Sequence, residues 1–124
     1  MVDVNEITAK ILSQLQKDGI SVCYQYPEDF GRVPAVSHYE LFDSEGFRAD
    51  NAEWSQKSRV QIDIWAEKKT EPARIAVMVN SLMQGAGWLR EFSRDMPKQT
   101  EQHLYHKTMR FAKEIYPEGG EGNG

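Results

Sequence analysis

The chain has 124 residues, a formal net charge of −4 and 40% hydrophobic residues, a composition that is ordinary for one globular domain. Its 15 basic residues are scattered among 19 acidic ones, which gives no strong general attraction to nucleic acid or to an anionic membrane. The single cysteine, Cys23, excludes an intrachain disulfide and indicates a reducing compartment. Charges within the first twenty residues and the lack of a long apolar run predict a cytoplasmic protein without a membrane partner.

The first predicted element is an amphipathic helix over residues 4–17. Its apolar side chains fall on one narrow stripe at the helical period: Val4, Ile7, Ile11 and Leu15. Asp3 with Glu6 three residues later resembles a capping box, and Asp18-Gly19 can turn left-handed after the last turn. Both ends of this helix are therefore marked in the sequence.

A first strand is expected over residues 20–26, because apolar and polar side chains alternate there until Pro27 interrupts the pattern. One face of this strand is predicted to carry four side chains: Ile20, Val22, Tyr24 and Tyr26. The following residues, 27–34, have the charge, glycine and proline content of a loop.

A second strand is predicted from Val33 or Ala35 to Phe42, followed by a turn at Asp43–Gly46. A third strand, Arg59–Trp65, alternates most clearly of all, with one apolar face: Val60, Ile62 and Ile64. Its other face carries an aromatic residue and both signs of charge. This composition suits a side of the sheet that is wet or covered by a partner.

Thr70 and Pro72 predict the start of a second helix over residues 71–84, because threonine can cap a helix and proline is tolerated in its first turn. Five apolar residues form its expected core face: Ile75, Met78, Val79, Leu82 and Met83. Gly85 ends the pattern. Val77 falls nearly opposite the core face, which makes it a candidate for a second contact surface.

Residues 104–116 leave two structures open. On a helical wheel their apolar and charged side chains gather on opposite sides, so periodicity alone favours a helix. As a strand they place Lys107 and Lys113 among apolar side chains, which the long lysine stems can tolerate. The Gly- and Glu-rich residues 117–124 predict a disordered tail beyond a single domain of residues 1–116.

Residue types capable of chemistry are present but not grouped. His103 and His106 have a spacing that can bind one metal ion on a helix but separates them on a strand. A metal site needs three or four ligands, and Asp95 is the nearest further candidate. We therefore favour structural or solvated histidines over a metalloprotein or small enzyme. Cys23, in an alternating strand, is more typical of a packed side chain than of a nucleophile.

The carboxylates Asp50, Asp63 and Asp95 lie in separate predicted elements, which favours solvated surface groups over an acid/base pair. Gly85-Ala86-Gly87 follows a helix and lacks the lysine of a phosphate loop. The aromatic residues are not accompanied by clustered basic ones, so a nucleic-acid-binding module is a minor alternative. We expect a protein that is not an enzyme and that uses no metal or cofactor.

Several segments together resemble the tail-completion or tail-terminator proteins of long-tailed bacteriophages: Ser58–Trp65 (SRVQIDIW), Glu71–Leu82 (EPARIAVMVNSL), Trp88 after Gly-Ala-Gly, and Leu104–Phe111 (LYHKTMRF). The resemblance covers residues 1–116 and carries no catalytic signature. It implies an α+β fold in which a mostly antiparallel sheet of four to five strands packs against two helices. It also implies that residues 102–115 form a strand, against the helical wheel.

The function implied by this resemblance is structural. Such a protein caps the head-proximal end of the tail tube, stops tube growth and offers a docking surface to the head connector or stopper protein. Its partners would be further copies of itself in a hexameric ring, the tail-tube protein and the connector. It would be found in the host cytoplasm during assembly and then in the virion neck. A head-to-tail adaptor of the same neck region is the main alternative.

A ring of identical subunits needs heterologous contacts, in which one patch meets a different patch on the neighbour. The side chains that we predict for such contacts are Phe30 in the first loop, Trp54 before the third strand, and Val77 on the second helix. Packing in the core is the competing explanation for each of them.

Overall fold

The computed structural model describes residues 3–41, 56–97 and 103–115. These residues form, in chain order, α1 (Val4–Leu12), the 3-10 turn η1 (Ser13–Asp18), β1 (Ser21–Tyr24), the 3-10 turn η2 (Phe30–Arg32), β2 (Ala35–Leu41), β3 (Gln56–Ala66), α2 (Glu71–Gly85), β4 (Leu89–Met96) and β5 (Tyr105–Ile115). The predicted turn at Asp43–Gly46 and the predicted tail, residues 117–124, lie outside the described residues.

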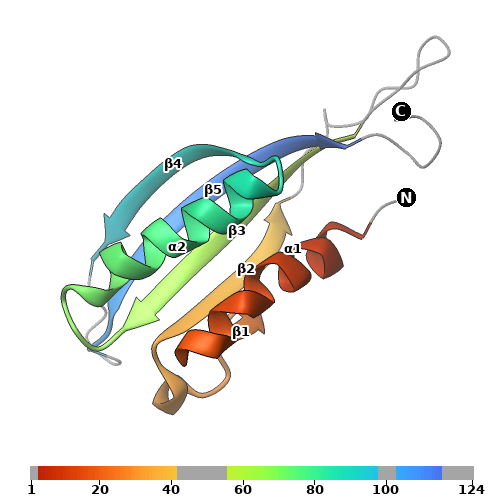
Figure 1. Ribbon diagram of the computed structural model, residues 1–124. Coiled ribbons are helices and arrows are strands. Elements are labelled where there is room, and N and C mark those ends of the chain that lie inside the picture. The colour runs from red at the N-terminus through yellow and green to blue at the C-terminus, as the bar shows by residue number, and fades with distance from the viewer. Residues whose placement is uncertain (1–2, 42–55, 98–102, 116–124) are drawn as a thin grey trace, which may run out of the picture.

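Within the described residues, the strands form one five-stranded sheet in the order β1-β2-β3-β5-β4. β1 pairs with β2 in parallel, and the other three pairings are antiparallel. Both α-helices lie on the same face of this sheet, α1 over β1 and β2, and α2 over β3 and β5 (Figure 1). The predicted α+β fold with a mostly antiparallel sheet and two helices is therefore confirmed.

The hydrophobic core fills the space between the sheet and the two helices. The sheet contributes a layer of fully buried side chains from its three central strands: Val36, Val60, Ile62, Ile64, Met109 and Phe111. Of the predicted core face of α2, Ile75, Val79 and Met83 are fully buried, while Met78 and Leu82 are partly buried against the same cluster. Trp88, which directly precedes β4, is also buried there.

The first helix begins where the sequence placed it, but the α-helix ends at Leu12 and the chain continues to Asp18 as the 3-10 turn η1. Its buried side also differs from the prediction. The Asp3 carboxylate accepts a hydrogen bond from the amide of Glu6 at 3.2 Å, and Gly19 ends η1 with a φ of 77°. The predicted stripe is wrong in part, because Ile7 and Ile11 are only half-buried while Thr8 and Leu12 face the core. Thr8 tolerates burial because its hydroxyl donates to the carbonyl oxygen of Val4 at 2.9 Å.

Two further predictions about the first strand and the second helix need correction. β1 ends at Tyr24, before the expected Tyr26, because the backbone at Gln25 adopts a φ of 69° and leaves the strand direction. Thr70 occupies the N-cap position of α2, but its side chain forms no capping hydrogen bond. The helix itself runs over Glu71–Gly85 and agrees with the prediction within one residue.

The C-terminal segment of the sheet resolves the choice left open by the sequence. β5 is a strand paired along its length with β3, so the helical interpretation of residues 104–116 is wrong. Lys113, which the strand places on the core side, directs its Nζ to the carbonyl oxygen of Ala86 at 2.8 Å. It thereby satisfies a backbone acceptor at the C-terminus of α2, where a cation is electrostatically favoured.

β4 is a strand that the sequence pattern does not predict. It is an outer strand of the sheet and contains a bulge between Arg90 and Phe92, which breaks the period of two that identifies strands in a sequence. Among the described residues, no helix has the length and apolar character needed to cross a bilayer.

Candidate interaction surfaces

The three predicted contact residues have different outcomes. Val77 is 70% exposed on the outer side of α2, as its position opposite the core face predicted. Phe30 begins the turn η2, but its side chain is outside what the structure describes. Trp54 lies outside the described residues altogether. Of the three, Val77 is therefore the one whose side chain the structure describes, and it is exposed.

The candidate metal ligands are not brought together. His103 precedes β5, His106 contacts Asp63, and Asp95 instead forms an ion pair with Lys107 at 3.0 Å. Among the residues that the structure describes, no three histidine, cysteine or acidic side chains are placed to share a metal ion. Nothing in this region therefore supports the metalloprotein alternative.

Cys23 is half-buried in β1, and its thiol donates to the carbonyl oxygen of Val36 at 3.7 Å. Burial, with a smaller contribution from the nearby Glu28 carboxylate, raises the pKa of the Cys23 thiol above 9.0. A catalytic thiol requires the opposite shift, because the thiolate is the nucleophile. The packed-side-chain interpretation fits this environment.

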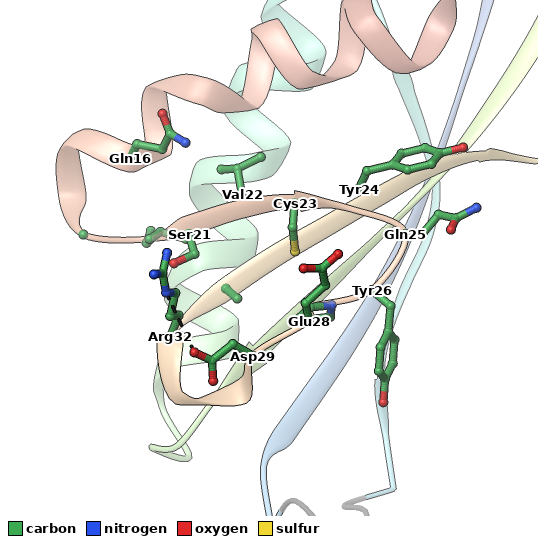
Figure 2. A pocket seen from close by; sticks show the side chains of 14 residues that line it. Gln16, Ser21, Val22, Cys23, Tyr24, Gln25, Tyr26, Glu28, Asp29 and Arg32 are labelled. Carbon is green, nitrogen blue, oxygen red and sulfur yellow. Dashed lines mark ion pairs between the residues drawn. The ribbon is translucent and has the colours of Figure 1, made fainter.

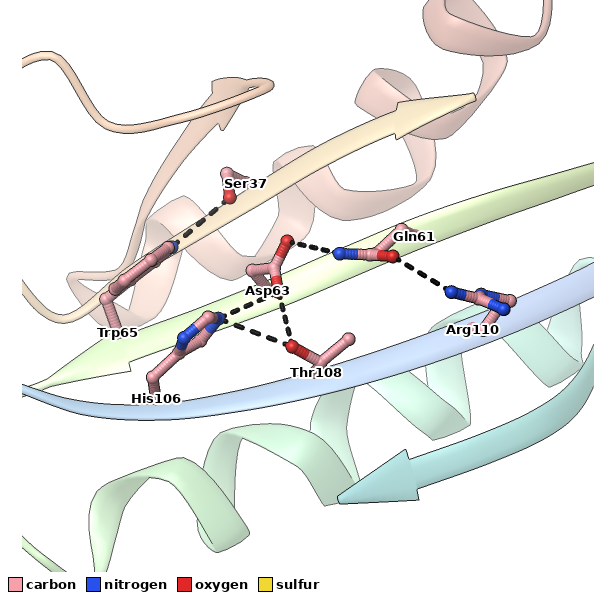
Figure 3. Close-up of polar contacts among 7 residues, drawn as sticks. All are labelled: Ser37, Gln61, Asp63, Trp65, His106, Thr108 and Arg110. Carbon is pink, nitrogen blue, oxygen red and sulfur yellow. Dashed lines mark hydrogen bonds and ion pairs between the residues drawn. The ribbon is translucent and has the colours of Figure 1, made fainter. Parts of the chain in front are cut away.

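The sheet face turned away from the helices carries a cluster of polar side chains centred on Asp63 (Figure 3). Thr108 donates its hydroxyl to Asp63 Oδ1 at 2.6 Å, and His106 Nε2 lies 2.8 Å from the same oxygen. Gln61 donates from Nε2 to Asp63 Oδ2 at 3.2 Å. Asp63 is only 5% exposed, so the prediction of a solvated surface carboxylate is wrong. Its charge is tolerated because both oxygens accept hydrogen bonds.

Aromatic side chains border this cluster on the side of β2. The rings of Trp65 and His106 are stacked with centroids 3.8 Å apart, and Tyr26 meets Trp65 edge-on at 5.3 Å. The indole of Trp65 donates to the hydroxyl of Ser37 at 3.2 Å (Figure 3). Aromatic contacts contribute about 0.5–1.5 kcal/mol beyond the area that they bury. Because Trp65 and Ser37 are buried, these side chains of β2, β3 and β5 pack against one another.

On the side of β4 the same face is more basic. Arg110 donates to Gln61 Oε1 at 3.3 Å, and its guanidinium lies 4.8 Å from the ring centre of Phe92. Arg59 forms an ion pair with Glu91 of β4 at 3.2 Å. Aromatic residues and arginine are enriched at protein interfaces. The face opposite the helices thus has the composition of a contact surface.

Two hollows flank the outer strand β1. One lies on the side of α1 and is lined by Asp3, Glu6 and His38, among others. The other follows the chain from Gly19 to Ala35 and is lined by Glu28 and Asp29, as Figure 2 shows. They share four lining residues, so they form one continuous surface around β1: Gln16, Val22, Cys23 and Tyr24. We call this surface the β1 edge.

His38 lies at the floor of the hollow beneath α1. It is 3% exposed, its ring meets Tyr24 edge-on at 5.9 Å, and its Nδ1 is buried without a hydrogen-bond partner. Burial lowers the pKa of His38 from its ordinary value of 6.5, which favours the neutral ring. In the sequence this histidine stands apart from the other candidate residues. Residues two apart on a strand point to the same face, and Val36 is an apolar core residue. The sequence could therefore have predicted that His38 faces the helices.

Comparison with known proteins bears on the fold alone. No family model and no curated protein matches this sequence. Among solved structures, the chain is similar to a chain from the virion of a native gene transfer agent (GTA) particle, with a TM-score of 0.57 and 14% identity. The alignment covers 89% of this chain and 84% of that chain. At this identity the likeness establishes a shared α+β architecture over nearly the whole of both chains.

Proposed function

We propose that this protein is a structural component of a phage or phage-like virion. More specifically, we propose that it is a tail terminator, which caps the head-proximal end of the tail tube and carries the docking surface for the head connector. The observation that supports it most is the shared fold with a chain of a gene transfer agent virion over 89% of this chain. The sequence resemblance to tail-terminator proteins supports the same assignment independently.

The surface chemistry is consistent with a role in assembly. A terminator has to bind a growing tube end more tightly than the next tube subunit does, and it has to leave no site for further addition. Such a task requires complementary surfaces and no bond-making chemistry. Two such surfaces lie on opposite sides of the molecule: the exposed Val77 on α2, and the half-buried Phe92 and Arg110 on the sheet face that carries the buried Asp63 cluster.

The proposal is tested by mass measurement in solution combined with negative-stain imaging, first alone and then with tail-tube protein. We expect closed rings, formed alone or on the end of a tube, and binding at one end only. Protein that stays monomeric in both experiments and does not bind to tubes would refute the terminator assignment. A neck adaptor predicts a different outcome, namely binding to the connector with no effect on the tube.

A matched pair of variants separates the outer surface of α2 from the fold. Val77→Asp is expected to leave unfolding unchanged, because Val77 is 70% exposed. If this surface meets the tube or the connector, the same variant weakens that contact. Gln14→Asp, at an exposed position of η1 and outside α2, serves as the control for added charge. Equal binding by wild type and both variants would remove Val77 from the contact surface.

A further inference from the structure

The two outer strands of the sheet give each subunit two different exposed sides. In the order β1-β2-β3-β5-β4, β1 and β4 lie at opposite ends, and neither has a second neighbouring strand within the described residues. A closed ring of identical subunits needs two unlike patches on different sides of each subunit. The two edges meet this geometric requirement. Whether they attract one another depends on their charges.

The β1 edge is predominantly acidic. Its lining residues include the carboxylates of Asp3, Glu6, Glu28 and Asp29, and Arg32 is the one cation among them. Arg32 lies 3.9 Å from Asp29, so these two charges largely offset one another. Glu6 and Glu28 are exposed and form no ion pair within the described part of the chain. This edge therefore presents uncompensated negative charge.

The outer strand β4 (Leu89–Met96) forms the opposite edge of the sheet, which we call the β4 edge, and its unpaired charges are basic. The two acidic residues of β4 are already paired within the subunit, Glu91 with Arg59 at 3.2 Å and Asp95 with Lys107 at 3.0 Å. Arg90 and Arg94, by contrast, are exposed and have no ion pair among the described residues. The β4 edge therefore presents net positive charge to a partner.

The β1 edge also has groups suited to a guanidinium. Tyr24 is 52% exposed and Tyr26 is 50% exposed, and a planar guanidinium stacks well on such rings. Lysine, a compact ammonium, would use the aromatic faces less well.

We propose that the β4 edge of one copy of this chain docks against the β1 edge of the next copy, with Arg90 and Arg94 placed against Glu6, Glu28 and the two exposed tyrosines. The inference rests on the proposed ring and adds which surfaces close it. Because one edge meets a different edge, the contact repeats around the ring and leaves no end unused. It places β1 and β4 between subunits, so the Asp63 face and the outer side of α2 remain for other partners.

The test is a charge swap. Glu6→Lys/Glu28→Lys makes both edges basic, and Arg90→Glu/Arg94→Glu makes both edges acidic. Each double variant should repel itself and associate at least about tenfold more weakly than wild type at low salt. An equimolar mixture should recover assembly, because unlike variants can alternate around an even-numbered ring such as a hexamer. The chain carrying all four substitutions should also recover it, since its edges are again opposite in charge.

Association is followed by sedimentation velocity and negative-stain imaging, with circular dichroism to show that each variant is folded. Lys68→Glu/Lys69→Glu, at exposed positions between β3 and α2, produces the same change in net charge as Arg90→Glu/Arg94→Glu and should assemble like wild type. The differences should shrink as salt rises from about 0.1 M to about 1 M, where the screening length falls to about 3 Å.

Three results would overturn the inference. One is wild-type assembly by either double variant, and another is a mixture that stays as dissociated as its components. The third is wild-type protein that shows no self-association up to about 1 mM, alone or on tubes. In the first two cases, rings that still cap tube ends would leave the proposed function intact. If both edges bind only a different virion protein, the same variants would lose that binding without any change in self-association.

Discussion

Replacing Asp63 with alanine tests whether the polar cluster on the open sheet face holds the sheet together. The side chain has 5% exposure and accepts hydrogen bonds from Thr108 at 2.6 Å and Gln61 at 3.2 Å, with His106 Nε2 at 2.8 Å. The contacts with Thr108 and His106 join β3 to β5, whereas Gln61 belongs to β3 itself. Removal of the carboxylate takes the 2.6 Å acceptor from the buried Thr108 hydroxyl, which keeps only the longer contact of 3.4 Å with His106 Nε2.

The magnitude follows from the hydrogen bonds that the substitution removes. A typical hydrogen bond contributes about 1 kcal/mol net, and a buried donor left unpaired costs a further 1–3 kcal/mol or so. Thr108 is 5% exposed and can recover little from water, whereas Gln61 is only half-buried. We therefore expect Asp63→Ala to lower the free energy of unfolding by about 3 kcal/mol. At about 4 °C per kcal/mol for a domain of this size, Tm falls by about 12 °C.

Urea unfolding followed by tryptophan fluorescence measures this change, and thermal circular dichroism checks it independently. Asp95→Ala is the matched control, because Asp95 is 80% exposed on β4 and pairs only with Lys107. It should change stability by less than about 0.5 kcal/mol. Asp63→Asn should fall between the two, since its carbonyl oxygen can still accept from Thr108. An Asp63→Ala loss no larger than that of Asp95→Ala would refute the structural role of the cluster.

Three further outcomes are expected. Burial lowers the pKa of His38 in the folded state, so the histidine of the unfolded chain is protonated first as pH falls. The free energy of unfolding of the wild type should therefore decline below about pH 6.5. In urea titrations at several pH values, His38→Gln should make that decline smaller. Because the pKa of Cys23 is raised, its reaction with a disulfide reagent at neutral pH should be slower than that of a free thiol, and Glu28→Gln should accelerate it modestly. Lys113→Met, which removes the donor to Ala86, should lower Tm by about 4 °C in thermal melts.

Features set by neighbours in the chain were predictable. The Asp3 cap, the left-handed Gly19 and the alternation of β3 depend on residues within a few positions of each other, and all three are present. The C-terminal strand is an intermediate case. Its local pattern favours a helix, and only the resemblance to a family gives the correct structure, because pairing with β3 outweighs its helical periodicity.

Features set by distant residues were not predictable. The sequence pattern assigns Asp63 to the surface because its partners His106 and Thr108 lie 43 and 45 positions later and reach it only through strand pairing. β4 is not predicted from the sequence, because its bulge interrupts the alternation of apolar and polar side chains and its outer position leaves most of its side chains exposed. The β1 edge depends on how α1 packs beside β1, which no local pattern encodes.

Whether this protein ends a tail tube can be measured in a tube-growth experiment. Tail-tube protein is allowed to polymerise with increasing amounts of the purified chain, and tube lengths and ends are recorded by electron microscopy. A tail terminator should give shorter tubes, each closed at one end by added density, with little effect on the number of tubes. Tubes of unchanged length with bare ends, at concentrations where the protein is folded, would contradict it.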